Sequence, residues 1–254
     1  MDLGLADRRF LVGGASRGLG AAVVRALAAD GARVAGVSRT TGEPGGTGTG
    51  RSVEIAADLS ASDGPAQAVR AAIDALGGLD GLVVNSGGPP GGTFEAVDEA
   101  GWERAIAGTL HSTLRLIRES LPHLREGRDP SIVIVLSSSV REPIPALITS
   151  NVLRPGLAGL IKSLVTEIAP VRINGVAPGR FDTDRVRSLD EARAAAAGVT
   201  VDVVQAQMRD RIPLGRYGDP DELGRVVAFL LSPAASYLDG VILPVDGGMI
   251  RSLP

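Results

Sequence analysis

A glycine-rich stretch near the start of the chain constrains the fold most strongly. Residues 13–20 read GGASRGLG, directly after the apolar run FLV at 10–12 and ahead of the helix-forming segment 21–27. This order predicts a strand, a turn and a helix, and a turn without bulky side chains lets backbone N–H groups approach a pyrophosphate closely. A structural turn that only needs positive φ angles would use the same residues, so the stretch alone does not decide function.

The rest of the chain alternates short apolar runs with longer amphipathic ones. The runs that predict strands lie at 9–12, 33–37, 52–56, 81–84, 131–136, 172–176 and 241–245, and helical patterns lie near 18–29, 64–76, 98–125, 155–168 and 220–231. Because the period switches from 2 to 3.6 residues and back, we predict a doubly wound α/β fold. The expected architecture is a single Rossmann domain over 1–254, with a parallel seven-stranded sheet and helices on both faces.

Composition narrows the class of protein. Hydrophobic residues make up 44% of the 254 residues and aromatic residues only 3%, which suits an aliphatic core between parallel strands and helices. A net charge of −3 gives no basic surface for nucleic acid, and the absence of cysteine excludes disulfides, thiolate catalysis and cysteine metal sites. We expect no metal, no membrane span of about 20 apolar residues and no signal peptide, hence a cytoplasmic protein.

The segment 41–50 is anomalous, because it is too rich in glycine to form the helix expected between the second and third strands. We interpret it as a flexible loop beside the adenosine half of a dinucleotide, which becomes ordered when a 2′-phosphate binds.

Charges at the end of the second strand predict the choice of dinucleotide. Folds that select NAD place an acidic residue there to hold the ribose hydroxyls, whereas this chain reads VSRT at 37–40. Arg39, together with Arg17 in the glycine turn, offers two guanidinium groups that suit a 2′-phosphate. We therefore expect NADP(H), although both arginines could also be solvated surface residues of an arginine-rich chain.

Five motifs, in order, resemble the short-chain dehydrogenase/reductase family, and within it the reductases of β-ketoacyl groups on a carrier protein. They are the glycine turn, the Asp-Leu pair at 58–59, the segment VNSG at 84–87, the Pro-Gly pair at 178–179 with the threonine at 183, and the segment VDGG at 245–248. The resemblance implies a cofactor site made by Gly14, Ser16, Arg17, Gly18, Leu19, Gly20, Ser38, Arg39, Asp58, Leu59, Asn85, Ser86, Gly87, Arg154, Pro178, Gly179 and Thr183.

The catalytic positions of the family are altered in this chain. Members carry Asn, Ser, Tyr and Lys, and alignment from Trp102 places these on Thr109, Ser137, Ser150 and Arg154, with Ser138 beside the retained serine. A serine hydroxyl is a far weaker acid than a tuned phenol, so a positioned general acid worth about 10²–10⁴ in rate is missing. An arginine with a pKa above about 12 can still reach ribose hydroxyls but takes no part in a proton relay.

Two functions therefore remain open. One is an oxidoreductase acting on a small carbonyl or alcohol substrate, with serines aligning the carbonyl and water or a carboxylate (Glu142, Asp182 or Asp184) handling the proton, and Arg180 as an electrostatic donor. The other is a catalytically silent NADP(H)-binding sensor, scaffold or subunit partner. By resemblance, residues 180–211 form a variable substrate lid, which could equally be a solvated amphipathic helix, and the helices at 98–125 and 155–168 form the interface of a homodimer or homotetramer.

Overall fold

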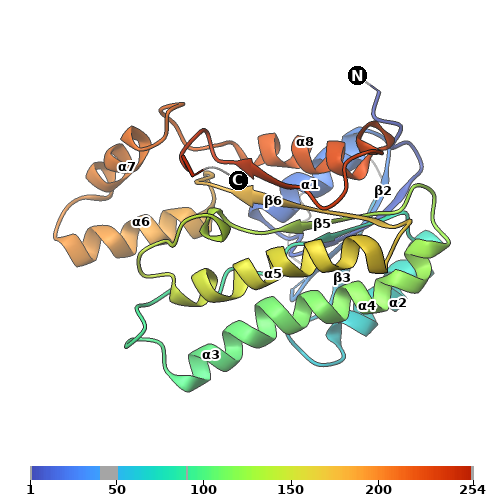
Figure 1. Ribbon diagram of the computed structural model, residues 1–254, viewed down its shortest axis with the longest axis horizontal. Helices are drawn as coiled ribbons and strands as arrows, with labels where there is room; N and C mark the ends of the chain where they lie inside the picture. Colours follow the sequence, from blue (N-terminus) through green and yellow to red (C-terminus); the bar gives the residue numbers. More distant parts are fainter. Residues whose placement is uncertain (1, 41–50, 90, 253–254) are drawn as a thin grey trace.

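A parallel sheet of seven strands forms the centre of the computed structural model, which describes residues 2–40, 51–89 and 91–252 (Figure 1). The strand order is β3-β2-β1-β4-β5-β6-β7. The strands are β1 (Arg9–Gly13), β2 (Arg33–Ser38), β3 (Ser52–Ala56), β4 (Gly81–Val84), β5 (Ser131–Val135), β6 (Arg172–Pro178) and β7 (Ile242–Val245). The predicted α/β fold is confirmed.

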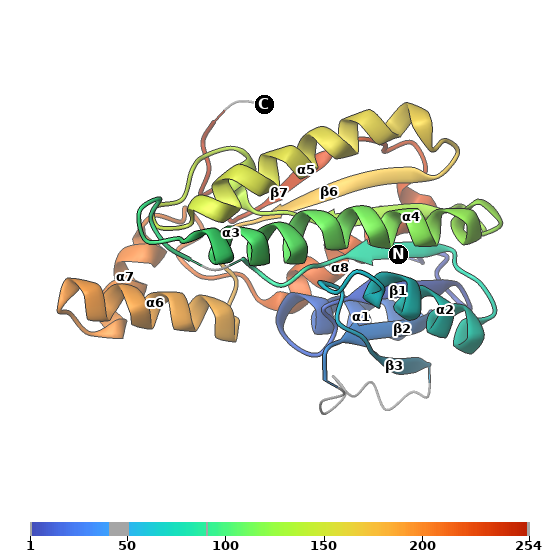
Figure 2. The same cartoon turned by 90° about the horizontal axis from the view of Figure 1, so that it is seen from below.

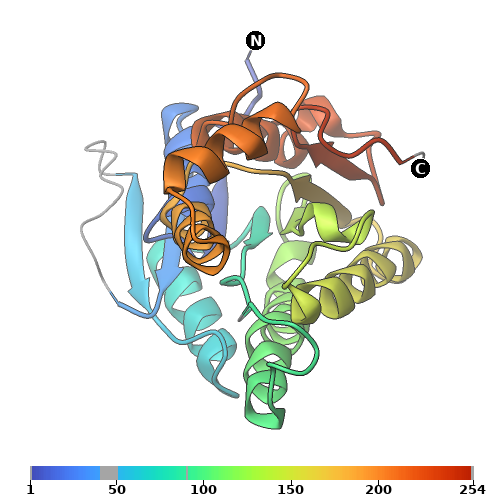
Figure 3. The same cartoon turned by 90° about the vertical axis from the view of Figure 1, so that its left-hand side faces the viewer.

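Helices cover both faces of the sheet, as the view along the layers in Figure 3 shows. On one face α1 (Gly18–Ala29) packs against α8 (Pro220–Leu231); the other face carries α2 (Gly64–Leu76), α4 (Ser112–Arg125) and α5 (Ile148–Glu167). α3 (Glu99–Ala105) and a π-helix (Ile106–His111) lead into α4 as one long rod (Figure 2). α6 (Asp184–Ala197) and α7 (Val201–Asp210) project from one end of the molecule, and short 3₁₀ helices lie at Ser138–Val140 and Pro233–Ala235.

The two cores follow from the alternation of side chains along each strand. In β1, Leu11 points into the core under α2, α4 and α5, while its neighbours Phe10 and Val12 point into the core under α1 and α8. All three are fully buried, as are the matching residues of β4 and β5. Strands buried on both faces read as continuous apolar runs, which is why they could be located in the sequence.

Two helices differ from their predicted limits. The pattern at 98–125 is one rod interrupted by the π-helix, and the helix predicted to begin at Pro155 begins at Ile148 instead. Proline disfavours the helical conformation in the residue before it and removes one hydrogen bond, so a helix that continues through Pro155 is locally unfavourable. The buried face of α5, which includes Thr149, Leu153, Leu157 and Ile161, offsets that cost with packing.

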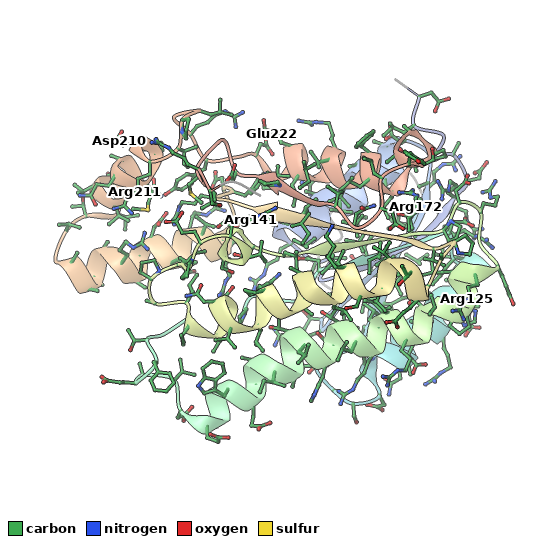
Figure 4. All side chains as sticks on the ribbon, in the orientation of Figure 1. Arg125, Arg141, Arg172, Asp210, Arg211 and Glu222 are labelled. Atoms are coloured by element: carbon green, nitrogen blue, oxygen red, sulfur yellow. The ribbon has the colours of Figure 1, made fainter. Side chains whose placement is uncertain are left out.

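Because all strands are parallel, the residues that follow them gather at one edge of the sheet. Figure 4 shows Arg172, the first residue of β6, at the opposite edge, and Arg141, which follows β5, toward the edge where α6 and α7 project. From β1 the chain adds strands toward one side of the sheet (β2, β3), and from β4 onward it adds them toward the other side, so the two halves meet between β1 and β4. Ligands of such sheets bind outside the carboxyl ends of the strands where the two halves meet. The loop predicted at 41–50 lies outside the described residues. Among the helices that the structure describes, none is long and apolar enough to span a membrane.

Candidate functional site

The glycine turn between β1 and α1 is shaped for close approach of a ligand. Gly14 and Gly18 have φ angles of +60° and +56°, which favour glycine. A Cβ on Gly20 would lie 2.0 Å from the carbonyl oxygen of Gly14, so only glycine fits there. The Asn85 side-chain amide donates to the carbonyl oxygens of Gly13 and Gly14, both at 3.3 Å, and joins the turn to the end of β4.

The first turn of α1 is open to an anion. Arg17 occupies the N-cap position without a side-chain hydrogen bond to the helix, and the first turn holds no acidic residue. Free N–H groups at a helix N-terminus bind phosphate oxygens. The shape of this turn is that of a site for the pyrophosphate of a dinucleotide, and the binding role predicted for Gly14, Ser16, Gly18, Leu19 and Gly20 stays a prediction.

The residues predicted for the adenosine half lie at the ends of β2 and β3. Asp58 accepts hydrogen bonds from the hydroxyl and the backbone N–H of Ser60, at 2.7 and 2.9 Å. These bonds, and then the charge of Arg39, lower the pKa of Asp58, which places Arg39 near it. Arg17 and Arg39 are both exposed, and Leu59 lies beneath Gly13.

A carboxylate that sequence reasoning missed lies close to this region. Glu54 of β3 lines a small recess together with Ser16 and Ser38. Strand register brings it there, because Gly36 of β2 pairs with Glu54, and Gly36 also lines the recess. The expectation that the region lacks an acid holds for the end of β2 only.

The predicted nicotinamide-side residues meet the glycine turn from the other direction. Pro178 ends β6 in register with Val245, and a Cβ on Gly179 would lie 2.6 Å from Cβ of Asp246. Thr183 caps α6 by accepting a hydrogen bond from the N–H of Val186, and its methyl group lies 3.5 Å from the Cβ position of Gly18. The structure therefore brings both predicted halves of the site together, with Ser86 and Gly87 on the loop after β4.

Three serines after β5 converge on the start of α5. Ser137 caps the 3₁₀ helix by accepting from the N–H of Ser139 at 3.1 Å, and Ser138 is buried next to it. The hydroxyl of Ser150 lies 3.1 Å from that of Ser139, and both residues are buried. Ser139 is a site residue that sequence reasoning missed; its only signal was its place in the run of three serines.

Arg154 lies one helical turn after Ser150 and is buried. Its guanidinium donates to the carbonyl oxygens of Val135, at the end of β5, and of Leu136, the latter at 2.8 Å, while its Nε has no partner among the described residues. Burial, and then the charge of Arg185, lowers the pKa of Arg154 to about 10. Burial thus acts against the high pKa expected for an arginine, and the group is still protonated at neutral pH.

Thr109 stands in the π-helix and is completely buried. Its hydroxyl oxygen has no hydrogen-bond partner among the described residues, while its carbonyl oxygen accepts from the hydroxyl of Thr113 at 2.7 Å. π-helices often mark functional positions. The role predicted for Thr109 from its alignment stays a prediction.

The acidic candidates for proton transfer lie elsewhere. Asp182 and Asp184 both form ion pairs with Arg187 on the exposed side of α6, the second at 2.8 Å, and Glu142 is exposed. Among the described residues, no carboxylate accepts a hydrogen bond from the serines at 137–139 or from Ser150. Hydroxyls and guanidinium groups therefore dominate the centre of the site.

A buried carboxylate joins α6 to the segment that follows β6. Asp190 of α6 is completely buried, forms an ion pair with Arg180 and accepts a hydrogen bond from the hydroxyl of Tyr217 at 2.8 Å. Burial, and then this hydrogen bond, raises the pKa of Tyr217. Arg180 is thus paired with Asp190 and is not free to act as an electrostatic donor. Tyr217, for which the sequence analysis predicted no role, connects α6 to the segment before α8.

Comparisons with known proteins agree with this geometry. A family model described as enoyl-(acyl carrier protein) reductase matches residues 14–250. The 3-oxoacyl-[acyl-carrier-protein] reductase MabA of Mycobacterium tuberculosis is 32% identical over 96% of this chain and 93% of its own, and the acetoacetyl-CoA reductase of Synechocystis sp. is 31% identical over 97% and 98%. The structure of L-sorbose reductase from Gluconobacter frateurii complexed with NADPH and L-sorbose has 25% identity, a TM-score of 0.92 and 100% coverage of both chains. The chain therefore belongs to the short-chain dehydrogenase/reductase family of oxidoreductases, and within it resembles the 3-oxoacyl-[acyl-carrier-protein] reductases.

Proposed function

We propose that this protein is an NADP(H)-dependent reductase of a carbonyl compound, with Ser150 and Arg154 in place of the family's tyrosine and lysine. The observation that carries the proposal is the pair of hydroxyls of Ser139 and Ser150, which are 3.1 Å apart and buried at the carboxyl edge of the sheet, the edge where the predicted nucleotide residues lie. The names of its relatives, which include reductases of 3-oxoacyl and acetoacetyl groups, support the same reaction class. The NADPH in the related L-sorbose reductase supports the cofactor.

The chemistry follows from the groups in the site. When bound, NADPH supplies the hydride that reduces the carbonyl carbon. In place of their mutual hydrogen bond, the hydroxyls of Ser139 and Ser150 each donate a hydrogen bond to the carbonyl oxygen, and the field of the buried Arg154 stabilises the negative charge that develops on it. Water delivers the proton, because a serine hydroxyl is too weak an acid to do so near neutral pH.

The direct test is oxidation of NADPH, followed by absorbance, in the presence of ketones, oxo acids, their esters and 3-oxoacyl thioesters. Turnover of any of them supports the proposal. Binding of NADPH without turnover of any carbonyl compound would instead favour the silent sensor or scaffold. The Ser150→Tyr/Arg154→Lys double variant, assayed in parallel, shows what the family's own pair of residues does in this site.

The Ser150→Ala variant should retain most of the native activity. The lost hydrogen bond is worth about 1 kcal/mol, so kcat should fall by less than about tenfold. The rate should also lack the alkaline pKa that a catalytic tyrosine imparts. Steady-state kinetics across pH measure both effects, and Ser163→Ala, on the same helix but exposed, is the matched control. Complete loss of a fast native activity in Ser150→Ala would show that the serine itself transfers the proton.

The cofactor preference should depend on Arg39. We expect NADP(H) to bind at least about tenfold more tightly than NAD(H), equivalent to about 1.4 kcal/mol, and Arg39→Ala to remove that preference. Calorimetric titration of both dinucleotides measures the ratio. Arg70→Ala, an exposed arginine on α2, should leave it unchanged. Equal affinities for the two dinucleotides in the native protein would contradict the assignment and direct attention to Glu54.

Two further elements of the proposal concern assembly and location. We propose a homodimer or homotetramer formed through α4 and α5, which lie next to each other on one face of the sheet (Figure 2), and a cytoplasmic location. Exposed Val152 on α5 is consistent with a contact surface, with 54% of its area accessible. Light scattering on the purified protein measures the oligomeric state.

A further inference from the structure

Two arginines at the site lack a carboxylate partner. Arg9, Arg180 and Arg187 form ion pairs with aspartates, whereas within residues 2–40, 51–89 and 91–252 neither Arg154 nor Arg185 has one. Arg154 is buried, whereas Arg185 lies on the exposed side of α6, where an anion can reach it. A cation without a counter-charge attracts an anion, most strongly where part of its surface is shielded from water.

Arg185 reaches from α6 across to the loop that follows β4. Its Nη2 donates to the carbonyl oxygen of Pro89 at 2.7 Å, and a Cβ on Gly88 would lie 2.5 Å from its Nε. At its start, the loop contacts the glycine turn through the side chain of Asn85. Further along, the N–H of Gly92 donates to the carbonyl oxygen of Ala146, just before α5, at 2.7 Å. Arg185 therefore contacts this loop at Pro89, between its contact with the glycine turn and its contact with the segment that leads to Ser150.

The charges of the two guanidinium groups influence each other. Desolvation lowers the pKa of Arg185, and the charge of Arg185 adds to burial in lowering the pKa of Arg154, so the two charges lie near enough to repel. The bond to Pro89 uses one of the five N–H donors of a guanidinium, which leaves a fork suited to a carboxylate. Arg154, by contrast, is held on the carbonyl oxygens of Val135 and Leu136.

We propose that the substrate is an oxo acid whose carboxylate is bound by Arg185 while its carbonyl oxygen lies on the hydroxyls of Ser139 and Ser150. This inference rests on the proposed reductase function and narrows its substrate class. The anion could in principle be a cofactor phosphate, but the open N-terminus of α1 already provides for the pyrophosphate, and Arg39 lies at the far end for a 2′-phosphate. Arg154 contributes its field to the same anion without contacting it.

The test compares oxo acids with their uncharged methyl esters: pyruvate, acetoacetate and levulinate against methyl pyruvate, methyl acetoacetate and methyl levulinate. The native protein should reduce at least one acid with a kcat/KM at least about tenfold above that of its ester, as expected for a charge-assisted hydrogen bond. Arg185→Gln should raise KM for that acid by a similar factor and leave the ester unchanged. Arg187→Gln, two residues along the same helix and paired with Asp182 and Asp184, should keep the native preference.

Three results would overturn the inference. The first is equal turnover of acids and esters, and the second is an equal loss for both in Arg185→Gln. The third is a loss of NADPH affinity in Arg185→Gln, which would assign the arginine to a cofactor phosphate. If no carbonyl compound is reduced, calorimetric titration of the same acids into the NADP⁺-loaded protein tests the carboxylate site separately from the reductase proposal. Binding that Arg185→Gln removes supports the carboxylate site even though the reductase proposal fails. Absence of binding rejects both proposals.

Discussion

The Gly20→Ala variant is expected to lose NADPH affinity by roughly 10- to 100-fold. The added Cβ would lie 2.0 Å from the carbonyl oxygen of Gly14 and 2.8 Å from the side-chain nitrogen of Asn85, so the turn must move away from both. Forcing an extra carbon into a packed position costs about 1–3 kcal/mol, and each 1.4 kcal/mol is a factor of ten in affinity. The displaced atoms are those that shape the cradle at the N-terminus of α1. Fluorescence titration with NADPH measures the loss.

A second glycine provides the matched control. Gly159 lies in the exposed part of α5, and a Cβ there would meet nothing within 4 Å. Gly159→Ala should therefore bind NADPH with native affinity and, because alanine favours helix, should be no less stable. Native affinity in Gly20→Ala would show that the turn does not bind the dinucleotide, whereas equal losses in both variants would show that the titration reports on stability rather than on the site.

The strands of this fold could be predicted from the sequence because each is buried on both faces. A continuous apolar run such as FLV at 10–12 has no polar side chain that could face solvent, which is typical of a strand buried on both faces. The structure extends β1 beyond its predicted end by only one residue, to Gly13. The start of α5 could not be predicted in the same way, because the local preference of Pro155 against a preceding helix opposes the packing of residues 148–154. Tertiary packing decides such cases, and here it places Ser150 and Arg154 one turn apart on a buried helical face.

The positions of the residues predicted for the cofactor could be located from the sequence, since they follow successive strands and parallel strands end at one edge; their role in binding stays a prediction. Contacts between distant segments could not be located in this way. Ser139 reaches Ser150 only because the 3₁₀ helix folds back on α5, and Arg185 reaches Pro89 only because α6 lies over the loop after β4. Likewise, the acidity of Arg154 depends on its burial and on a charge 31 positions further along the chain. These features are set by three-dimensional packing, which no local pattern encodes.

Residues 180–211 contain a buried contact that fixes α6 to the end of the sheet. The sequence left open whether the segment 180–211 is a lid or a solvated helix, and Asp190 now gives it a buried anchor to Arg180 and Tyr217. With α6 fixed at that point, Arg185 is held one and a half turns before the anchor, on the side of the loop after β4. A rigid attachment of this kind positions a binding group better than a free loop does.

The Asp80→Ala variant should lower the free energy of unfolding by about 3–5 kcal/mol, the usual cost of leaving one partner of a buried ion pair without the other. The side chain of Asp80 is completely buried just before β4, and its two oxygens accept four hydrogen bonds. Three come from Arg9, through its backbone N–H at 2.8 Å, its Nε at 3.0 Å and its Nη2 at 2.9 Å, and the fourth comes from the backbone N–H of Arg128 at 2.8 Å. Urea denaturation measures the change, and Asp74→Ala, exposed on α2, should alter it by less than about 0.5 kcal/mol.

The stabilisation by Asp80 should also depend on pH in a defined direction. Burial acts to raise the pKa of Asp80, but the hydrogen bonds from Arg9 and Arg128 outweigh it and hold the pKa below its usual value. The unfolded chain, with an ordinary pKa of about 3.9, therefore binds a proton before the folded chain does as the pH falls. The stabilisation is complete above about pH 5 and is lost below about pH 4, so the native protein and Asp80→Ala should converge in stability under acid. Because Asp80 lies at the edge of the sheet opposite the site, the variant should bind NADPH normally while it remains folded; a constant stability difference down to pH 3 would show that the carboxylate is not the group responsible.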